Sequence, residues 1–174
     1  GANNVGGLFR DNLQAFGVEP QAVDTLLLTH AHPDHIGGLL DEAGAAVYPN
    51  ARLYIHPLEV AFWQNDERLA QANERAQRNF IRARQTLAVY GERVSLLDDK
   101  PIIEGIHPVH LPGHTPGHTG FRIDTPQSSL LIWGDIVHFP YIQTAHPDVS
   151  IAFDIDPEQA KASRKRILAQ AAQE

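Results

Sequence analysis

The sequence predicts a mixed α/β domain, and three observations support this class. With 174 residues, the chain has about the length of one domain that can enclose a proper hydrophobic core. Several short apolar runs are rich in β-branched residues and are bounded by Gly, Pro or Asp, which is typical of strands. Other stretches repeat apolar residues at helical spacing. We therefore expect one α/β domain over residues 1–174.

The N-terminal part is predicted to alternate short helices and strands. Leu8, Leu13 and Phe16 recur near helical spacing, and Gly17 is a plausible end for that helix. His56 and Pro57 close a later strand. The predicted elements are an irregular start over residues 1–7, a helix over 8–16, a buried strand over 23–28, a helix over 36–42 that ends near Gly44, and a strand over 52–55.

Residues 58–90 form a long helical pattern with breaks around 65–66 and 71–78. The polarity of this segment favours a solvated helical insertion over a dedicated partner surface. A lid is a third interpretation, because Phe62 and Trp63 are bulky side chains beside a predicted strand end. We list both as candidate substrate-binding residues, with core packing as the alternative.

The C-terminal half is predicted to contain four strands followed by a helix. Asp156, Pro157 and Glu158 provide an N-cap, a proline at the first position and an acid in the first turn. The strands are expected over residues 94–97, 106–111, 120–123 and 130–133, and the helix continues over 160–172.

Composition excludes several classes of protein. The chain has 14 basic and 21 acidic residues, a formal charge of −7 and no basic patch, so nucleic acid is not an expected partner. It has no cysteine, which excludes disulfides and thiolate ligands. No apolar run is long enough to cross a bilayer, and the start carries no signal-peptide pattern. We expect a soluble protein that resides in the cytoplasm or the periplasm. The sequence leaves open whether it forms a homo-oligomer.

Four potential metal ligands lie within six residues, at His30, His32, Asp34 and His35. In an extended segment alternate side chains share a side, so His30 and His32 are expected to bind one ion. Asp34 and His35 follow a turn at Pro33 and are expected to face a second ion. The alternative is that these residues cluster by chance or cap a helix. Four potential ligands within six residues argue against that alternative.

Two further donors follow later in the chain. His114 lies in a loop rich in glycine and proline, and Asp135 directly follows the apolar run at 130–133. A buried carboxylate without a partner would be costly, so a cation beside Asp135 is expected. Imidazole and carboxylate donors without thiolate favour an open, water-holding site for zinc, iron, manganese or cobalt.

These motifs, in this order, resemble those of metallo-β-lactamase-fold hydrolases: His30-x-His32-x-Asp34-His35, then Gly113-His114-Thr115-Pro116-Gly117-His118, then Gly134-Asp135. Residues 134–138, 151–154 and 156–164 are further similar to the branch of methyl parathion hydrolase and related lactonases and arylesterases.

The resemblance implies an αββα sandwich with a two-metal site, most simply two zinc ions. By position, His30, His32 and His114 would bind the first ion, Asp34 and His35 the second, and Asp135 would bridge both. The family has an additional histidine ligand and first strands that find no counterpart here. We therefore expect an incomplete portion of a longer chain, lacking N-terminal strands and a C-terminal segment; the start at Gly1 and the absence of methionine fit this expectation.

The expected function is an enzyme that uses a metal-bound hydroxide to hydrolyse a small-molecule ester, lactone, phosphotriester or amide. Asp34 is the expected catalytic residue, orienting the hydroxide and passing its proton to the leaving group. Analogy with the similar branch ranks lactone or ester first. The alternatives are a mononuclear iron dioxygenase, a glyoxalase-II-like thioesterase, and a non-catalytic relative of the same fold.

The remaining histidines are expected to play lesser roles. His118 is expected to support the ligand His114 through a hydrogen bond, and His138 to support a ligand or line the pocket. Surface or packing roles are expected for the others, which are His56, His107, His110 and His146.

Overall fold

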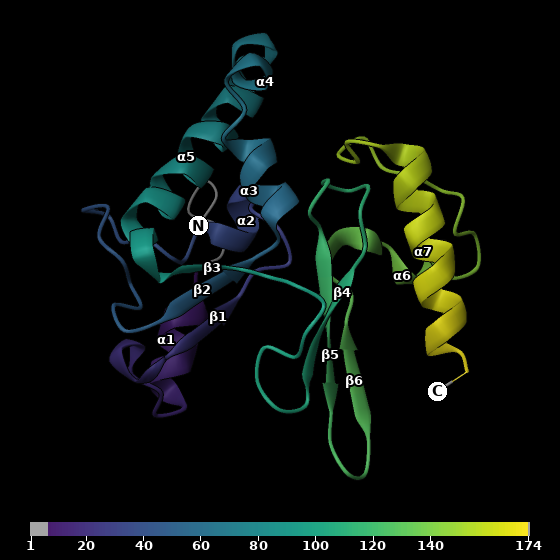
Figure 1. Ribbon diagram of the computed structural model, residues 1–174, viewed down its shortest axis with the longest axis horizontal. Helices are drawn as coiled ribbons and strands as arrows, with labels where there is room; N and C mark the ends of the chain where they lie inside the picture. The colour runs from purple at the N-terminus through teal and green to yellow at the C-terminus, as the bar shows by residue number, and fades with distance from the viewer. Residues whose placement is uncertain (1–6, 174) are drawn as a thin grey trace. The chain divides into compact units, whose positions relative to one another are not determined.

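The computed structural model describes residues 7–173, which form helices and two three-stranded sheets (Figure 1). This confirms the predicted α/β class. The chain divides into two compact units. Unit 1 holds the described residues up to Ile55 together with Trp63–Leu96, and unit 2 holds His56–Phe62 and the described residues from Leu97 onward. Of the predicted irregular start, residues 1–6 lie outside the described part.

The sheet of unit 1 is parallel, with the strand order β1-β2-β3. In β2, Leu53 and Ile55 are buried while Arg52 is exposed, as expected for a strand with one covered face. All three predicted strands form, although the first is shorter than its apolar run: β1 (Thr25–Leu27), β2 (Arg52–Ile55) and β3 (Val94–Leu96).

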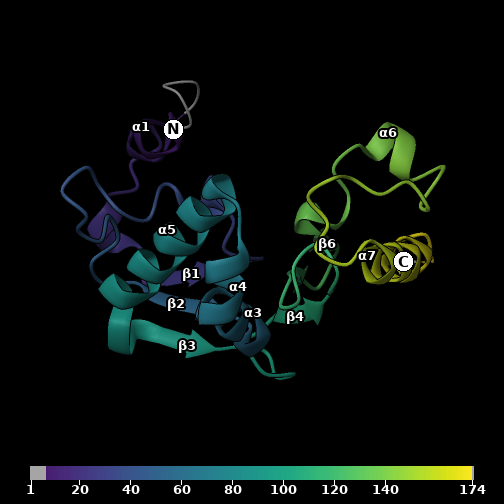
Figure 2. The ribbon, with the colours of Figure 1, turned by 90° about the horizontal axis from the view of Figure 1, so that it is seen from above.

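Helix α5 (Glu74–Tyr90) lies along one side of this sheet in Figures 1 and 2. Its buried residues include Phe80, Leu87 and Tyr90, while most of its exposed residues are polar. The side chains of Asn65 and Asn73 each accept a hydrogen bond from the backbone N–H three residues on, which starts a new helix. The α-helices that precede α5 in the chain are α1 (Phe9–Ala15), α2 (Pro33–Ile36), α3 (Pro57–Trp63) and α4 (Asp66–Gln71).

The prediction of a helix over residues 36–42 is wrong. Helix α2 ends at Ile36, and the chain then turns back through an isolated bridge between Leu40 and Ala46. The Asp41 side chain accepts a hydrogen bond from the Ala45 N–H, and Gly44 adopts a positive φ of 81°. Paired glycines after α2 and a turn closed by Asp41 override the apolar spacing on which that prediction rested.

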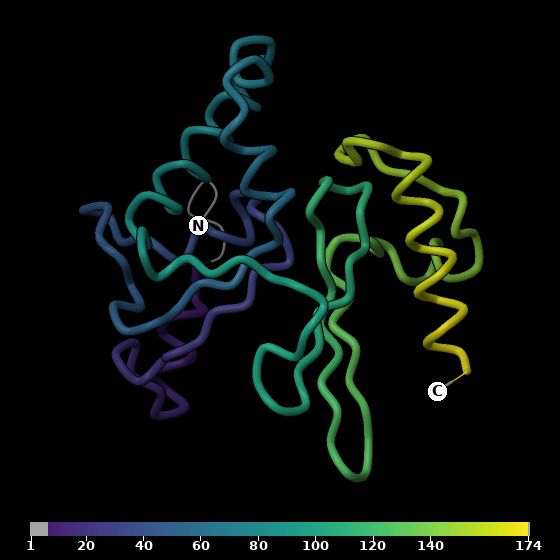
Figure 3. The backbone as a smooth tube through the Cα atoms, in the orientation of Figure 1, coloured from purple at the N-terminus to yellow at the C-terminus, as the bar shows by residue number. Residues whose placement is uncertain are grey.

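The sheet of unit 2 is antiparallel, with the order β4-β5-β6. Its strands are β4 (Ile106–His110), β5 (Thr119–Asp124) and β6 (Ser129–Ile132), which confirms the three predicted strands. Because the strands alternate in direction, the 111–118 loop and the segment after β6 emerge at the same end of the sheet, and the 125–128 turn lies at the other (Figure 3).

Helix α7 (Pro157–Ala171) supplies the other layer of the unit 2 core. The Asp156 side chain caps it by accepting from the Gln159 N–H, as the sequence predicted. Gly113 adopts a φ of 129°, and a Cβ there would lie 2.0 Å from the Ala160 nitrogen, so the 111–118 loop packs directly on α7. The core cluster is Leu111, Ile136, Val137, Ala160 and Ile167.

The other elements are short: η2 (Pro20–Ala22), η3 (Gly91–Arg93), η4 (Gly134–Ile136) and α6 (Pro140–Gln143). Over the described residues, no helix combines the length and the apolar character that a membrane span requires.

Candidate metal-binding residues

Three imidazoles of unit 1 meet where β1 gives way to α2. His30 is fully buried, and its ring centroid lies 4.7 Å from that of His32 and 4.1 Å from that of His35. His32 is the N-cap residue of α2, and Pro33 occupies the first helical position, so the turn after the strand is fixed by proline. The structure therefore brings together three of the four donors of the histidine-rich motif.

The fourth donor, Asp34, is placed differently. Its side chain is 74% exposed, and its Oδ2 lies 3.6 Å from the His35 Nε2, which is too long for a hydrogen bond. Asp34 therefore stands at the solvent-facing side of α2, where its carboxylate is accessible.

A second group of donors lies in unit 2, at the sheet end where the 111–118 loop and the segment after β6 meet. His114, Asp135 and His138 each offer one ligand atom, and these atoms all lie within 4.8 Å of one another. The Asp135 Oδ2 is 3.6 Å from the His114 Nε2 and 3.0 Å from the His138 Nε2. His138 thus lies against a predicted ligand, at a distance that permits either a hydrogen bond to Asp135 or a shared ion.

His118 uses both ring nitrogens within unit 2. Its Nδ1 lies 3.1 Å from the Leu111 carbonyl, to which it must donate, so its Nε2 accepts from the Asp135 N–H at 3.0 Å. The ring is fully buried. His118 therefore ties the 111–118 loop to the backbone of Asp135 and has no nitrogen left for a metal ion.

Two buried carboxylates that sequence reasoning missed hold the 111–118 loop. The Asp154 Oδ1 lies 3.0 Å from the His114 Nδ1, and the Glu59 Oε2 accepts from the Thr115 hydroxyl at 2.6 Å and the Gly117 N–H at 3.2 Å. Each contact spans at least 40 positions of sequence, so no local pattern could have revealed it.

The pKa of Asp154 reflects these contacts. Burial by itself raises the pKa, but the hydrogen bonds from His114 and the Ile151 N–H, together with the nearby Arg164 guanidinium, outweigh it. The pKa of Asp154 is therefore held below its usual value, and the carboxylate is ionised at neutral pH.

The donors present fit a divalent transition-metal ion. With Nδ1 engaged by the Asp154 carboxylate, His114 presents its Nε2 on the side of Asp135. A carboxylate on the rear nitrogen is the usual arrangement of a metal-ligating imidazole, because it fixes the tautomer and raises the basicity of the other nitrogen. Imidazole and carboxylate donors without cysteine suit zinc, manganese or iron.

The remaining predicted residues lie in packed surroundings. Trp63 is buried and its ring lies 5.5 Å from that of His32 and 4.9 Å from that of Phe80, while Phe62 is buried in unit 2. The substrate contacts predicted for Phe62 and Trp63 stay a prediction. Among the other histidines, the rings of His56 and His110 stack at 4.1 Å, which is a packing role.

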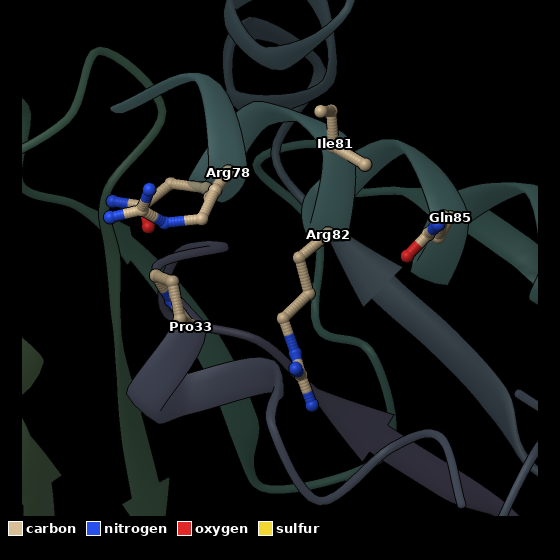
Figure 4. Close-up of a pocket in the computed structure, with 6 residues that line it drawn as sticks. Pro33, Arg78, Ile81, Arg82 and Gln85 are labelled. Atoms are coloured by element: carbon tan, nitrogen blue, oxygen red, sulfur yellow. The ribbon is translucent and has the colours of Figure 1, made fainter. Parts of the chain in front are cut away.

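A cavity of about 330 Å³ lies on unit 1 beside the histidine-rich motif, against α5 (Figure 4). In this view the Arg78 side chain lies above Pro33 and the Arg82 side chain lies to its right. The lining contains these two guanidinium groups and no carboxylate, so its charge is positive: Pro33, Arg78, Asn79, Ile81, Arg82 and Gln85.

Comparison with solved structures returns hydrolases and lactonases. One is the hydrolase AbOPH of the β-lactamase superfamily, with 35% identity and a TM-score of 0.86, covering 96% of this chain and 59% of its own. Another is AidC, a dizinc quorum-quenching lactonase solved with a product, with 30% identity and a TM-score of 0.90, covering 98% of this chain and 60% of its own. An N-acyl homoserine lactone hydrolase at 24% identity, with a TM-score of 0.66 and coverage of 95% and 58%, shares the fold.

The chain thus spans about 60% of the length of these structural relatives. No curated protein sequence matches it. The sequence model of the metallo-β-lactamase superfamily matches residues 1–174. From the full-length family match and the agreement with AbOPH and AidC, we conclude that this chain belongs to the metallo-β-lactamase superfamily.

Proposed function

We propose that this chain carries the metal ligands of a hydrolase that cleaves a lactone or a carboxylic ester of a small molecule, with two zinc ions as cofactor. The observation that carries the proposal is the cluster of the proposed ligands His114 and Asp135 with His138, in which one side-chain N or O atom of each residue lies within 4.8 Å of the others. Membership of the metallo-β-lactamase superfamily supports metal dependence, and the dizinc lactonase AidC, at 30% identity, supports zinc and a lactone.

We assign the ligands from the order of the motifs along the chain. His30, His32 and His114 would hold the first ion, Asp34 and His35 would hold the second, and Asp135 would serve both. Ions of this kind, when bound, lower the pKa of a shared water and polarise the bond to be cleaved.

The protein residues contribute orientation and proton transfer. Asp34 is accessible, so its carboxylate can orient the nucleophile and carry a proton to the leaving group. His118 holds the Asp135 backbone through the hydrogen bond to its Nε2, and His138 contacts the Asp135 carboxylate. Phe62 and Trp63 are proposed to contact the substrate.

Hydrolysis assays on the intact gene product test this function. An N-acyl homoserine lactone, an aryl acetate and an aryl phosphotriester should be compared before and after chelation, with zinc added back. We expect the lactone or the ester to be hydrolysed fastest, and His32→Ala to lower kcat/KM by more than about 100-fold. His146→Ala is the matched control because His146 is exposed and belongs to neither donor group.

The proposal is wrong if the lactone and the ester are hydrolysed at full rate after complete removal of metal. Iron in place of zinc, together with consumption of oxygen, would support the mononuclear dioxygenase. Preferential cleavage of a thioester would support the glyoxalase-II-like alternative.

A further inference from the structure

Behind His114 lies a buried ion pair between Asp154 and Arg164. The His114 and Asp154 side chains are 1% and 0% exposed, and the Arg164 side chain is 0% exposed. The His114 Nδ1 lies 3.0 Å from the Asp154 Oδ1, and the Arg164 Nη2 lies 3.5 Å from the Asp154 Oδ2. An imidazole, a carboxylate and a guanidinium therefore follow one another through the interior of unit 2.

The Asp154 carboxylate is fixed by its backbone as well as by its partners. Its Oδ2 accepts from the Ile151 N–H at 3.3 Å. The Ile155 N–H donates to the His114 carbonyl at 3.1 Å, and the Asp156 N–H donates to the Gly113 carbonyl at 2.9 Å. The segment that carries Asp154 is thus bonded directly to the backbone carbonyls of Gly113 and His114, so the carboxylate and the backbone of His114 are held together.

Arg164 extends this support to the segment that carries Asp135 and His138. Its Nε donates to the Ile136 carbonyl at 2.6 Å, next in sequence to Asp135. Its Nη1 donates to the Pro147 and Val149 carbonyls, both at 2.9 Å. One guanidinium from α7 therefore contacts the carboxylate behind His114 and the backbone beside Asp135.

A structural role alone explains this arrangement poorly. A buried guanidinium loses hydration, and a buried ion pair is often no more stabilising than apolar residues of the same volume. The pair instead gives His114 one defined tautomer, with the proton on Nδ1 and the lone pair on the nitrogen that faces Asp135.

We propose that Asp154 is a positioning residue that orients His114 as a metal ligand, and that Arg164 holds Asp154 and the Ile136 backbone so that His114 and Asp135 keep a fixed separation. The inference rests on the proposed metal-binding function. It adds Asp154 and Arg164 to the residues on which metal affinity depends.

Zinc affinity, measured by competition with a chromophoric chelator, tests the proposal without any assay of activity. Asp154→Asn keeps the size of the side chain and an oxygen that accepts from the His114 Nδ1–H, but removes the charge. We expect it to weaken zinc binding by roughly 10- to 100-fold and to alter the absorption spectrum of the cobalt-loaded protein. Asp148→Asn is the matched control, since Asp148 is exposed, lies on the same segment and pairs with Lys165 at 2.7 Å.

Two results would overturn the inference. The first is an Asp154→Asn variant that binds zinc within about twofold of the wild type and of Asp148→Asn, because the pair would then be structural only. The second needs no variant: in the metal-free wild type, nitrogen NMR of the histidine rings should find the proton of neutral His114 on Nδ1, and a proton on Nε2 contradicts the proposal. A wild type that binds no zinc overturns the proposed function and the inference together, whereas equal tight binding by wild type and Asp154→Asn overturns the inference alone.

Discussion

Removal of the Glu59 carboxylate should destabilise unit 2 through the 111–118 loop. Glu59 is 0% exposed, and its Oε2 accepts from the Thr115 hydroxyl and the Gly117 N–H, which are themselves buried. A hydrogen bond to a charged group contributes about 1.5 to 3 kcal/mol, and Glu59→Ala removes two of them. We therefore expect a loss of roughly 3 to 6 kcal/mol in the free energy of unfolding, a large share of a typical total.

Urea unfolding, followed by circular dichroism, measures this loss. Thr115→Val removes one of the two bonds and should cost about half as much. In the double variant, the loss should be smaller than the sum of the two single losses. Glu59→Gln keeps an acceptor oxygen and should recover part of the stability. Glu42→Ala is the control, because Glu42 is exposed and a surface substitution of this kind changes stability by less than about 0.5 kcal/mol. A loss below about 1 kcal/mol for Glu59→Ala would refute the reasoning.

Three further predictions concern packing and pH. Ile167→Ala empties part of the unit 2 core and should cost about 2 to 5 kcal/mol in urea unfolding; a smaller loss would show that the core collapses around the gap. Gly117→Ala places a Cβ 2.2 Å from the Glu59 nitrogen and should cost about 1 to 3 kcal/mol, whereas an unchanged midpoint would contradict the close packing. Burial and the neighbouring His110 lower the pKa of His56 to about 4 against the opposing effect of Asp99, so the unfolded chain binds a proton there that the folded chain does not. The free energy of unfolding should therefore fall as the pH drops from about 6.5 to about 4. We expect a loss of about 1 kcal/mol, because solvent screens this half-buried ring. His56→Gln should remove that part of the pH dependence.

Local signals were sufficient to predict most elements. Strands β2, β4, β5 and β6 match apolar runs bounded by turn residues, and α7 begins at the predicted Asp156 cap. These features depend on neighbours within a few positions, which the sequence displays directly. The prediction failed over residues 36–42 because apolar spacing was given more weight than the two glycines that follow α2.

The candidate ligands were also predictable, for a different reason. Four of them are nearly contiguous, and His114 and Asp135 follow features that mark the ends of strands. The supporting residues were not predictable, since Asp154 meets His114 across 40 positions and Glu59 meets Thr115 across 56. The partner of each carboxylate depends on how α3 and the segment before α7 pack on the 111–118 loop, and that packing has no local signature.

The most direct test of metal binding by this chain is the metal content of the purified gene product, measured by elemental analysis without added chelator. The account predicts two zinc ions per chain in the wild type and a reduced content in His114→Ala. No bound metal in a folded wild-type protein, or a content unchanged by His114→Ala, would contradict it.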